Sequence, residues 1–120
     1  MPKFLVHIHS GPENPTKAAL GSLVALSALK EGHTVDLFLA GDGASLIADS
    51  AHASVEGKGT GHLGIHFKGL AERGAHFYVS GMSAKARGLS EADLAGKPAE
   101  FAMPDVLVRL AADADVVLTY

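Results

Sequence analysis

Residues 75–88 read AHFYVSGMSAKARG, an apolar run followed by a serine–glycine pair and a stretch rich in helix-forming residues. The aromatic and β-branched side chains of residues 75–79 favour a short strand. Ser80 and Gly81 then interrupt the run, and the residues after them favour a short helix that ends at Lys85 or Arg87. A strand that turns sharply into a helix is the repeating unit of an α/β domain.

The same alternation extends along the chain on both sides of this segment. Further strands are expected at residues 4–8, 33–39, 99–102 and 115–119, where the apolar runs are short. Helices are expected at residues 16–31, 44–49, 62–73 and 104–112. Gly32 and Gly74 end two of these helices, in the position that glycine favours. This order predicts one domain, residues 1–120, that forms a three-layer α/β/α sandwich with a five-stranded, mainly parallel sheet, flavodoxin-like in outline.

The composition argues against several classes of protein. The formal net charge is −3 and the charges are scattered, unlike those of a dedicated nucleic-acid binder. No run approaches the roughly 20 apolar residues of a membrane span, and the apolar stretch after Lys3 is too short for a signal peptide. The chain has no cysteine, which fits a cytoplasmic protein. We therefore expect a cytoplasmic location and neither a nucleic-acid nor a membrane partner.

The candidate binding site lies where three of the expected strands end. In open parallel sheets, ligands bind at the carboxyl ends of the strands. The turns at residues 10–16, 41–45 and 80–83 lie there, each before an expected helix whose free N–H groups attract a small anion or polar ligand. The candidate ligand-binding residues are His9, Ser10, Gly11, Glu13, Asn14, Gly41, Asp42, Gly43, Ser80, Gly81, Met82 and Ser83. Residues 50–61 lack strong periodicity and are expected to form a mobile loop over this site.

Several polar residues of these turns also have a structural interpretation. Ser80 either helps to bind an anion or caps the helix that follows it. Glu13 and Asp42 either form a carboxylate pair or stabilise helix starts, and Lys85 and Arg87 face either an anionic ligand or solvent. A serine nucleophile is disfavoured, because the pattern Gly-x-Ser-x-Gly is absent around Ser80. We assign no catalytic residue and expect no cofactor.

The seven histidines suggest metal binding at first sight. His7 and His9 share one face of a strand, and His62 and His66 are neighbours on a helix. Either pair has the donor atoms that zinc prefers. A stable site needs a further ligand from another element, however, and no cysteine is available. We therefore expect no metal site.

Four segments together resemble those of the DsrE/DsrF-like sulfur-relay family. They are residues 10–16 (SGPENPT), 32–44 (GHTVDLFLAGDGA), 75–88, and the closing pair 102–104 and 114–119 (AMP and ADVVLT). Their order and spacing resemble the family pattern over nearly the whole chain. The resemblance implies a small cytoplasmic α/β protein that assembles into oligomers, often trimers or hexamers. In active members a cysteine often stands at the end of the strand that corresponds to residues 75–79, and it carries sulfur as a persulfide.

This sequence departs from the family at that position, where it has Ser80. A hydroxyl cannot hold persulfide sulfur or exchange thiols, because both reactions need a thiolate. Two hypotheses remain. In the first, the chain is a non-catalytic oligomeric protein that binds a small ligand or a partner. In the second, it is an accessory subunit of a sulfur-relay system that works with a partner's cysteine.

Self-association is expected from the first helix as well as from the resemblance. The helix at residues 16–31 is apolar around most of its circumference, although one stripe facing the sheet needs only about 100° of it. The remainder would be an exposed apolar patch unless a second subunit covered it. A homo-oligomer is therefore expected, and the resemblance makes a trimer the most plausible form.

Overall fold

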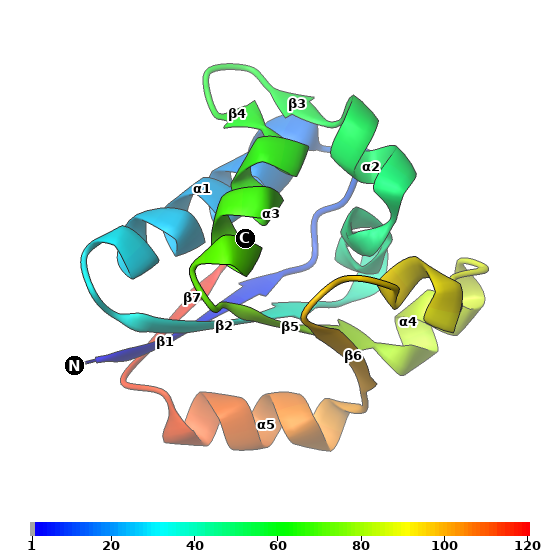
Figure 1. Cartoon of the computed structure of the whole chain (residues 1–120). Coiled ribbons are helices and arrows are strands. Elements are labelled where there is room, and N and C mark those ends of the chain that lie inside the picture. The colour runs from blue at the N-terminus through cyan, green and yellow to red at the C-terminus, as the bar shows by residue number, and fades with distance from the viewer. Residues whose placement is uncertain (1) are drawn as a thin grey trace.

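The computed structural model describes residues 2–120, and within them five parallel strands form a central sheet in the order β6-β5-β2-β1-β7 (Figure 1). The strands are β1 (Lys3–Ile8), β2 (Thr34–Leu39), β5 (His76–Ser80), β6 (Ala99–Ala102) and β7 (Val116–Thr119). All pairs in this sheet are parallel, with His7 opposite Phe38 and Phe38 opposite Tyr78. The α/β fold and its five strands are confirmed.

The helices cover the two faces of the sheet unequally (Figure 1). One face carries α1 (Pro15–Lys30), α2 (Asp49–Ser54), α3 (Leu63–Glu72) and the 3-10 turn η1 (Gly41–Ile47). The other face carries α5 (Pro104–Asp113), while α4 (Gly81–Ala86) and η2 (Glu91–Leu94) connect β5 to β6. The larger core lies under α1 and α3, and the smaller one centres on Leu5, Phe38 and Ala102 beneath α5. None of the residues of α5 is fully buried.

Local signals at both ends explain why α1 begins and ends where it does. The Asn14 side-chain oxygen accepts a hydrogen bond from the Lys17 N–H at 3.2 Å, and Pro15 occupies the first turn, where its missing N–H costs nothing. Gly32 follows the helix with a φ of 93°, in the left-handed region that glycine adopts without strain. Small residues let α1 lie close to the sheet, since a β-carbon on Gly21 would be 3.0 Å from the Ile8 side chain. The predicted ends of this helix differ from the observed ones by one residue.

The prediction of a loop at residues 50–61 was wrong, whereas the short helix expected near residues 44–49 is present as the 3-10 helix η1, which begins at Gly41 and ends at Ile47. The segment contains α2, β3 (Glu56–Gly57) and β4 (Gly61–His62), and the last two form an antiparallel hairpin. The hairpin is tied to the start of α1, because Thr16 accepts a hydrogen bond from the Lys58 N–H at 3.0 Å and its carbonyl accepts one from the Thr60 hydroxyl at 2.9 Å. Elements this short leave no periodic pattern in a sequence.

Much of the apolar surface of α1 is covered within the chain. The sheet, α3 and the hairpin pack around the helix, so that Ala18, Ala19, Ala25 and Leu26 are buried. Leu20 remains 36% exposed. The first helix therefore supports self-association less strongly than its sequence suggested.

Among residues 2–120, no helix combines the length and the apolar character that crossing a bilayer would require.

Candidate functional site

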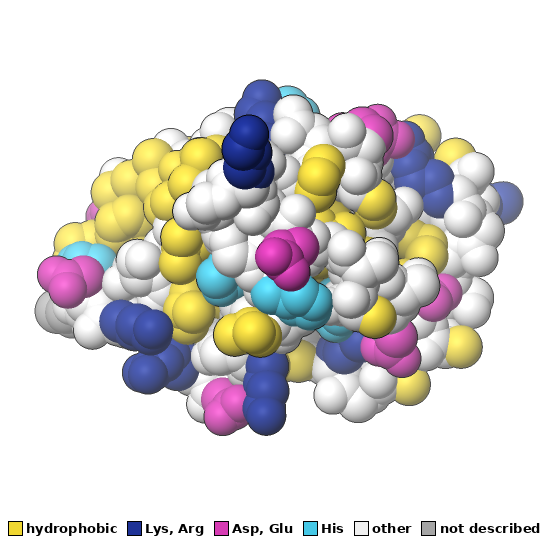
Figure 2. Space-filling model, turned by 90° about the horizontal axis from the view of Figure 1, so that it is seen from above, with side chains coloured by type: hydrophobic (Ala, Val, Ile, Leu, Met, Phe, Trp, Pro, Cys, Tyr) yellow, Lys and Arg dark blue, Asp and Glu magenta, His cyan; other side chains and the backbone are white. Residues whose placement is uncertain are grey.

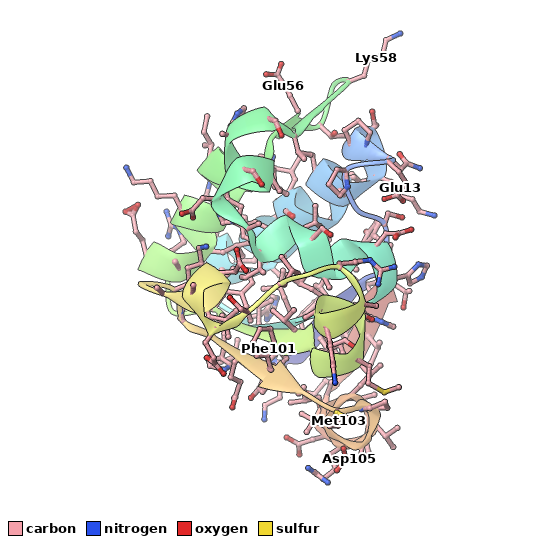
Figure 3. All side chains as sticks on the ribbon, turned by 90° about the vertical axis from the view of Figure 1, so that its right-hand side faces the viewer. Glu13, Glu56, Lys58, Phe101, Met103 and Asp105 are labelled. Atoms are coloured by element: carbon pink, nitrogen blue, oxygen red, sulfur yellow. The ribbon has the colours of Figure 1, made fainter. Side chains whose placement is uncertain are left out.

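The three predicted turns lie together at the carboxyl edge of the sheet. The Gly41 N–H donates a hydrogen bond to the Ser83 hydroxyl oxygen at 2.9 Å, which joins the second turn to the third. The first turn packs against the second so closely that a β-carbon on Gly11 would overlap the carbonyl oxygen of Asp42. Figure 3 looks onto this edge, with Glu13 on the first turn and Met103 at the start of α5. Sequence reasoning thus located one contiguous surface.

Ser80 caps a helix in this arrangement. It ends β5 and is buried, and its hydroxyl oxygen accepts a hydrogen bond from the Ser83 N–H at 3.2 Å. The next residue, Gly81, has no positive φ, and a β-carbon there would meet nothing closer than 3.8 Å. Met82 is 61% exposed beside it. The structural interpretation of Ser80 therefore has a hydrogen bond to support it.

Glu13 and Asp42 each have a partner of their own. The Glu13 carboxylate turns back to accept a hydrogen bond from the Gly11 N–H at 2.7 Å. The Asp42 carboxylate forms a 2.8 Å ion pair with the Arg87 guanidinium, which also donates to the Ser83 carbonyl oxygen. These contacts favour structural roles for the two acids over a carboxylate pair that shares a proton.

Arg87 is the residue of this edge whose position the sequence did not indicate. It follows α4, and its side chain reaches back to the turn after β2. A basic side chain on a short helix faces either solvent or a partner, and its sequence does not decide between them. The contact between Arg87 and Asp42 joins residues that are 45 positions apart, so local sequence does not predict it. The spacing of four from Ser83 was the available signal, because residues four apart lie on one helical face.

His9 is exposed at the end of β1, and its ring centroid lies 5.5 Å from that of His7. Burial, and secondarily the nearby His9, lowers the pKa of His7, so this ring is neutral near pH 7. The strand order reverses between β1 and β7, which places the switch point next to His9. The His9 N–H bonds the Tyr120 carbonyl oxygen at 2.9 Å, which fixes the end of β1 there.

The second pair of histidines makes backbone contacts. His66 Nε2 lies 2.8 Å from the Thr60 carbonyl oxygen, and His62 Nε2 lies 3.3 Å from that of Ala53. Within residues 2–120, no three histidine, aspartate or glutamate side chains are grouped to hold a metal ion. The turn at Thr60 and the helix α2 hold these two rings in place.

The remaining predicted residues complete the edge. Ser10 is buried under the first turn, and Asn14 caps α1 as described above. Gly43 lies against β1, because a β-carbon there would overlap the carbonyl oxygen of Ile8. The edge thus consists of tightly packed turns, and hydrogen bonds within the chain occupy the Ser80 and Ser83 hydroxyls.

The comparisons with known proteins agree with this fold. The crystal structure of the ychN protein from E. coli superposes with a TM-score of 0.81 at 17% sequence identity, covering 100% of both chains. At that identity the likeness concerns the fold alone. No curated protein matches the chain. The model of the DsrE/DsrF-like family matches residues 2–120, and the chain therefore belongs to the DsrE/DsrF-like family.

Proposed function

We propose that this chain is a non-catalytic, cytoplasmic member of its family that binds a small polar ligand or a partner segment at the carboxyl edge of the sheet. The observation that carries the proposal is the hydrogen bond that the Ser80 hydroxyl accepts. This hydroxyl caps α4, and the neighbouring Ser83 hydroxyl accepts the Gly41 N–H. Serine hydroxyls therefore join turns at the position where a reactive thiol stands in sulfur-carrying relatives.

Binding at this edge is supported by its exposed groups. Met82 and His9 are exposed at this edge, and the ion pair of Arg87 with Asp42 lies beside them. Gly81 lies beside the end of β6, where a β-carbon would be in van der Waals contact with the Ala102 carbonyl oxygen and the Met103 sulfur at 3.8 Å. We place a compact polar ligand against these exposed groups.

Assembly as a homo-oligomer, with a trimer as the expected form, is part of the proposal. The α5 side of the sheet supports it more strongly than α1 does, because α5 has no fully buried residue. Val108 on α5 is 67% exposed, and Val117 on the adjoining β7 is 45% exposed. A second subunit on this side would cover both valines and complete the outer layer.

An accessory role in sulfur relay is the second candidate. It is favoured by the exposed Met82, which lies two residues beyond Ser80 and would contact a partner that approaches this edge. In that case a partner's cysteine would carry the sulfur, and this chain would supply part of the surrounding surface.

Sulfur loading distinguishes the two functions. The protein is incubated with a sulfane-sulfur donor, with and without a cysteine-bearing DsrE-like protein, and intact masses are recorded. We expect no sulfur on this chain under either condition. Faster loading of the partner when this chain is present would favour the accessory role. A gain of sulfur on this chain that a thiol reductant removes would contradict both.

Binding at the edge is tested by NMR titration with phosphate and sulfate. The largest shifts are expected at Gly41, Gly81 and Ser83. Gly81→Leu should reduce them, because the bulky side chain fills the space beside β6 without forcing a strained φ. Shifts that map instead to Gly32 and Gly74, at the opposite edge of the sheet, would contradict the proposed site.

A further inference from the structure

An apolar pocket lies away from the carboxyl edge, between α2, α3 and the segment that leads into β6. Its volume is about 150 Å³, and its lining includes Ile47, Phe67, Phe77 and Pro98. Lys68 and Lys97 also line it. We propose that this pocket binds a small monocyclic aromatic acid, with the ring against Phe67 and the carboxylate next to Lys68.

The aromatic side chains of the pocket suit a flat ring. Phe67 and Phe77 stack with their centroids 4.8 Å apart and their planes inclined by 26°. The His52 ring meets Phe67 edge-on, with centroids 4.6 Å apart. Aromatic pairs add stabilisation beyond the area they bury, in edge-on as well as offset geometries. An apolar cavity of about 150 Å³ is also large enough for one benzene molecule.

The charges at the pocket favour an anion, and Lys68 is the cation available to bind it. The Lys97 ammonium is already held 2.9 Å from an Asp49 carboxylate oxygen and 2.6 Å from the Asp93 carbonyl oxygen. Lys68 is exposed, and among residues 2–120 it has no ion-pair partner. Burial, followed by the charge of Lys97, lowers the pKa of His52, so that ring is neutral and adds no positive charge, although its buried Nε2 has no hydrogen-bond partner. The site therefore combines an apolar interior with one unpaired positive charge.

A second hollow shares Lys68 and defines the competing occupant. This shallow groove of about 530 Å³ runs between α1 and α3, over Leu26 and Ile65, with Lys30 and Arg73 beside it. Figure 2 shows this side of the molecule, where Lys and Arg side chains lie next to exposed hydrophobic surface. An acidic peptide would use the groove as well as the pocket. We favour the free acid, because the aromatic wall belongs to the smaller pocket alone.

The proposal is tested by NMR titration of the ¹⁵N-labelled protein with benzoate. Saturable shifts are expected at Gly64, Phe67 and Gly96. Benzyl alcohol, which keeps the ring and lacks the charge, should bind about fivefold more weakly, as expected for one solvent-exposed ion pair. Acetate, which keeps the charge and lacks the ring, should give no saturable shift. Shifts at these residues would be distinct from those at Gly41 and Ser83, so this test and that of the carboxyl edge can fail independently.

Two variants test whether Lys68 binds the carboxylate and whether the ring enters the pocket. Lys68→Met should weaken benzoate binding about fivefold and leave benzyl alcohol unaffected, while Lys17→Met, an exposed lysine on α1, serves as the matched control. Ala71→Leu adds bulk to the pocket from an exposed position on α3 and should abolish binding of both compounds. If Ala71→Leu fails to give a folded spectrum, the Lys68→Met comparison decides.

Three results would overturn the proposal. The first is equal benzoate affinity in the wild type and Lys68→Met. The second is saturable benzoate shifts confined to other parts of the molecule, or no saturable shift at all. The third is tighter binding of the acetylated, amidated peptide Asp-Glu-Phe-Asp-Glu than of benzoate, with shifts that extend to Leu26 and Ile65. That last result would assign the surface to an acidic protein segment.

Discussion

At the scale of single residues, the Ser80 side chain offers an oxygen where a thiol would be needed to carry sulfur as a persulfide. The oxygen accepts a hydrogen bond from the Ser83 N–H, as a helix cap does. A sulfur atom at the same position would face the same donor, and an N–H group that points at a thiolate lowers the thiol pKa. The Arg87 guanidinium also contacts the Ser83 carbonyl oxygen, but its charge is paired with Asp42.

We therefore expect Ser80→Cys to accept one sulfane sulfur, which the wild type does not. Ser54→Cys, at an exposed position on α2, is the matched control and should load more slowly, because its thiol lacks the N–H donor. Intact mass against time after addition of a sulfur donor measures both rates. Equal rates in the two variants would show that the surroundings of residue 80 do not activate a thiol.

At the scale of elements, boundaries marked by proline, by glycine or by long periodic runs could be predicted from the sequence. The strand β6 follows Pro98 and the helix α5 begins at Pro104, and both lie close to where the sequence placed them. The hairpin of β3 and β4 could not be predicted, because each strand has two residues and depends on hydrogen bonds to Thr16. The positions of the three turns followed from the parallel sheet. Their hydrogen bonds did not, because partners such as Gly41 and Ser83 are 42 residues apart.

Two glycines at the carboxyl edge should respond differently to substitution. Gly43→Ala should destabilise the fold by about 1–3 kcal/mol, because the added carbon overlaps the Ile8 carbonyl oxygen. Gly81→Ala should leave stability unchanged or raise it by up to about 1 kcal/mol, because the position is helical and a β-carbon there makes only ordinary van der Waals contacts. Urea unfolding of both variants measures the difference. A similar loss in both would mean that the turn after β5 is packed more tightly than these distances indicate.

At the scale of the whole molecule, the two faces of the sheet are covered to different extents. One face has a large core beneath several helices, whereas the other has a small core beneath α5. If the second face is where subunits meet, a charge placed there should prevent assembly. One exposed apolar residue on each side of the molecule, Val108 and Ile65, can be replaced by glutamate to compare the two faces.

We expect Val108→Glu to convert the oligomer into monomers, since a charge buried at an interface without a partner is strongly unfavourable. Ile65→Glu, a substitution of equal charge at a residue of similar exposure on the opposite face, should leave assembly intact; the side chains are 67% and 69% exposed. Light scattering at micromolar concentration measures the mass. A wild type that is monomeric there would remove the basis of this prediction, and dissociation by Ile65→Glu alone would place the interface on the α1 and α3 side.

Stability should fall as the solution is acidified below about pH 6.5. Burial is the main cause that lowers the pKa of both His7 and His52 from the ordinary value of 6.5. The unfolded chain therefore binds protons at these residues before the folded chain does, and stability present above pH 6.5 is lost as the pH falls toward the folded pKa values. The double variant His7→Gln, His52→Gln should flatten this dependence below pH 6.5 in urea titrations. An unchanged slope would show that neither ring is neutral in the folded state.

The pairing of β1 with β7 has a consequence for how the protein is made. Phe4, the second residue of β1, already lies opposite Val116 of β7. The Lys3 carbonyl oxygen accepts a hydrogen bond from the Asp115 N–H at 2.8 Å. β7 is the last strand of the sheet to leave the ribosome. Until it does, the nascent chain presents β1 with one side unpaired, and an unpaired apolar strand is a template for pairing with other chains. Emergence of β7 from the ribosome is therefore the step that covers the unpaired side of β1, and chains that stop before β7 should be the ones that aggregate or need a chaperone.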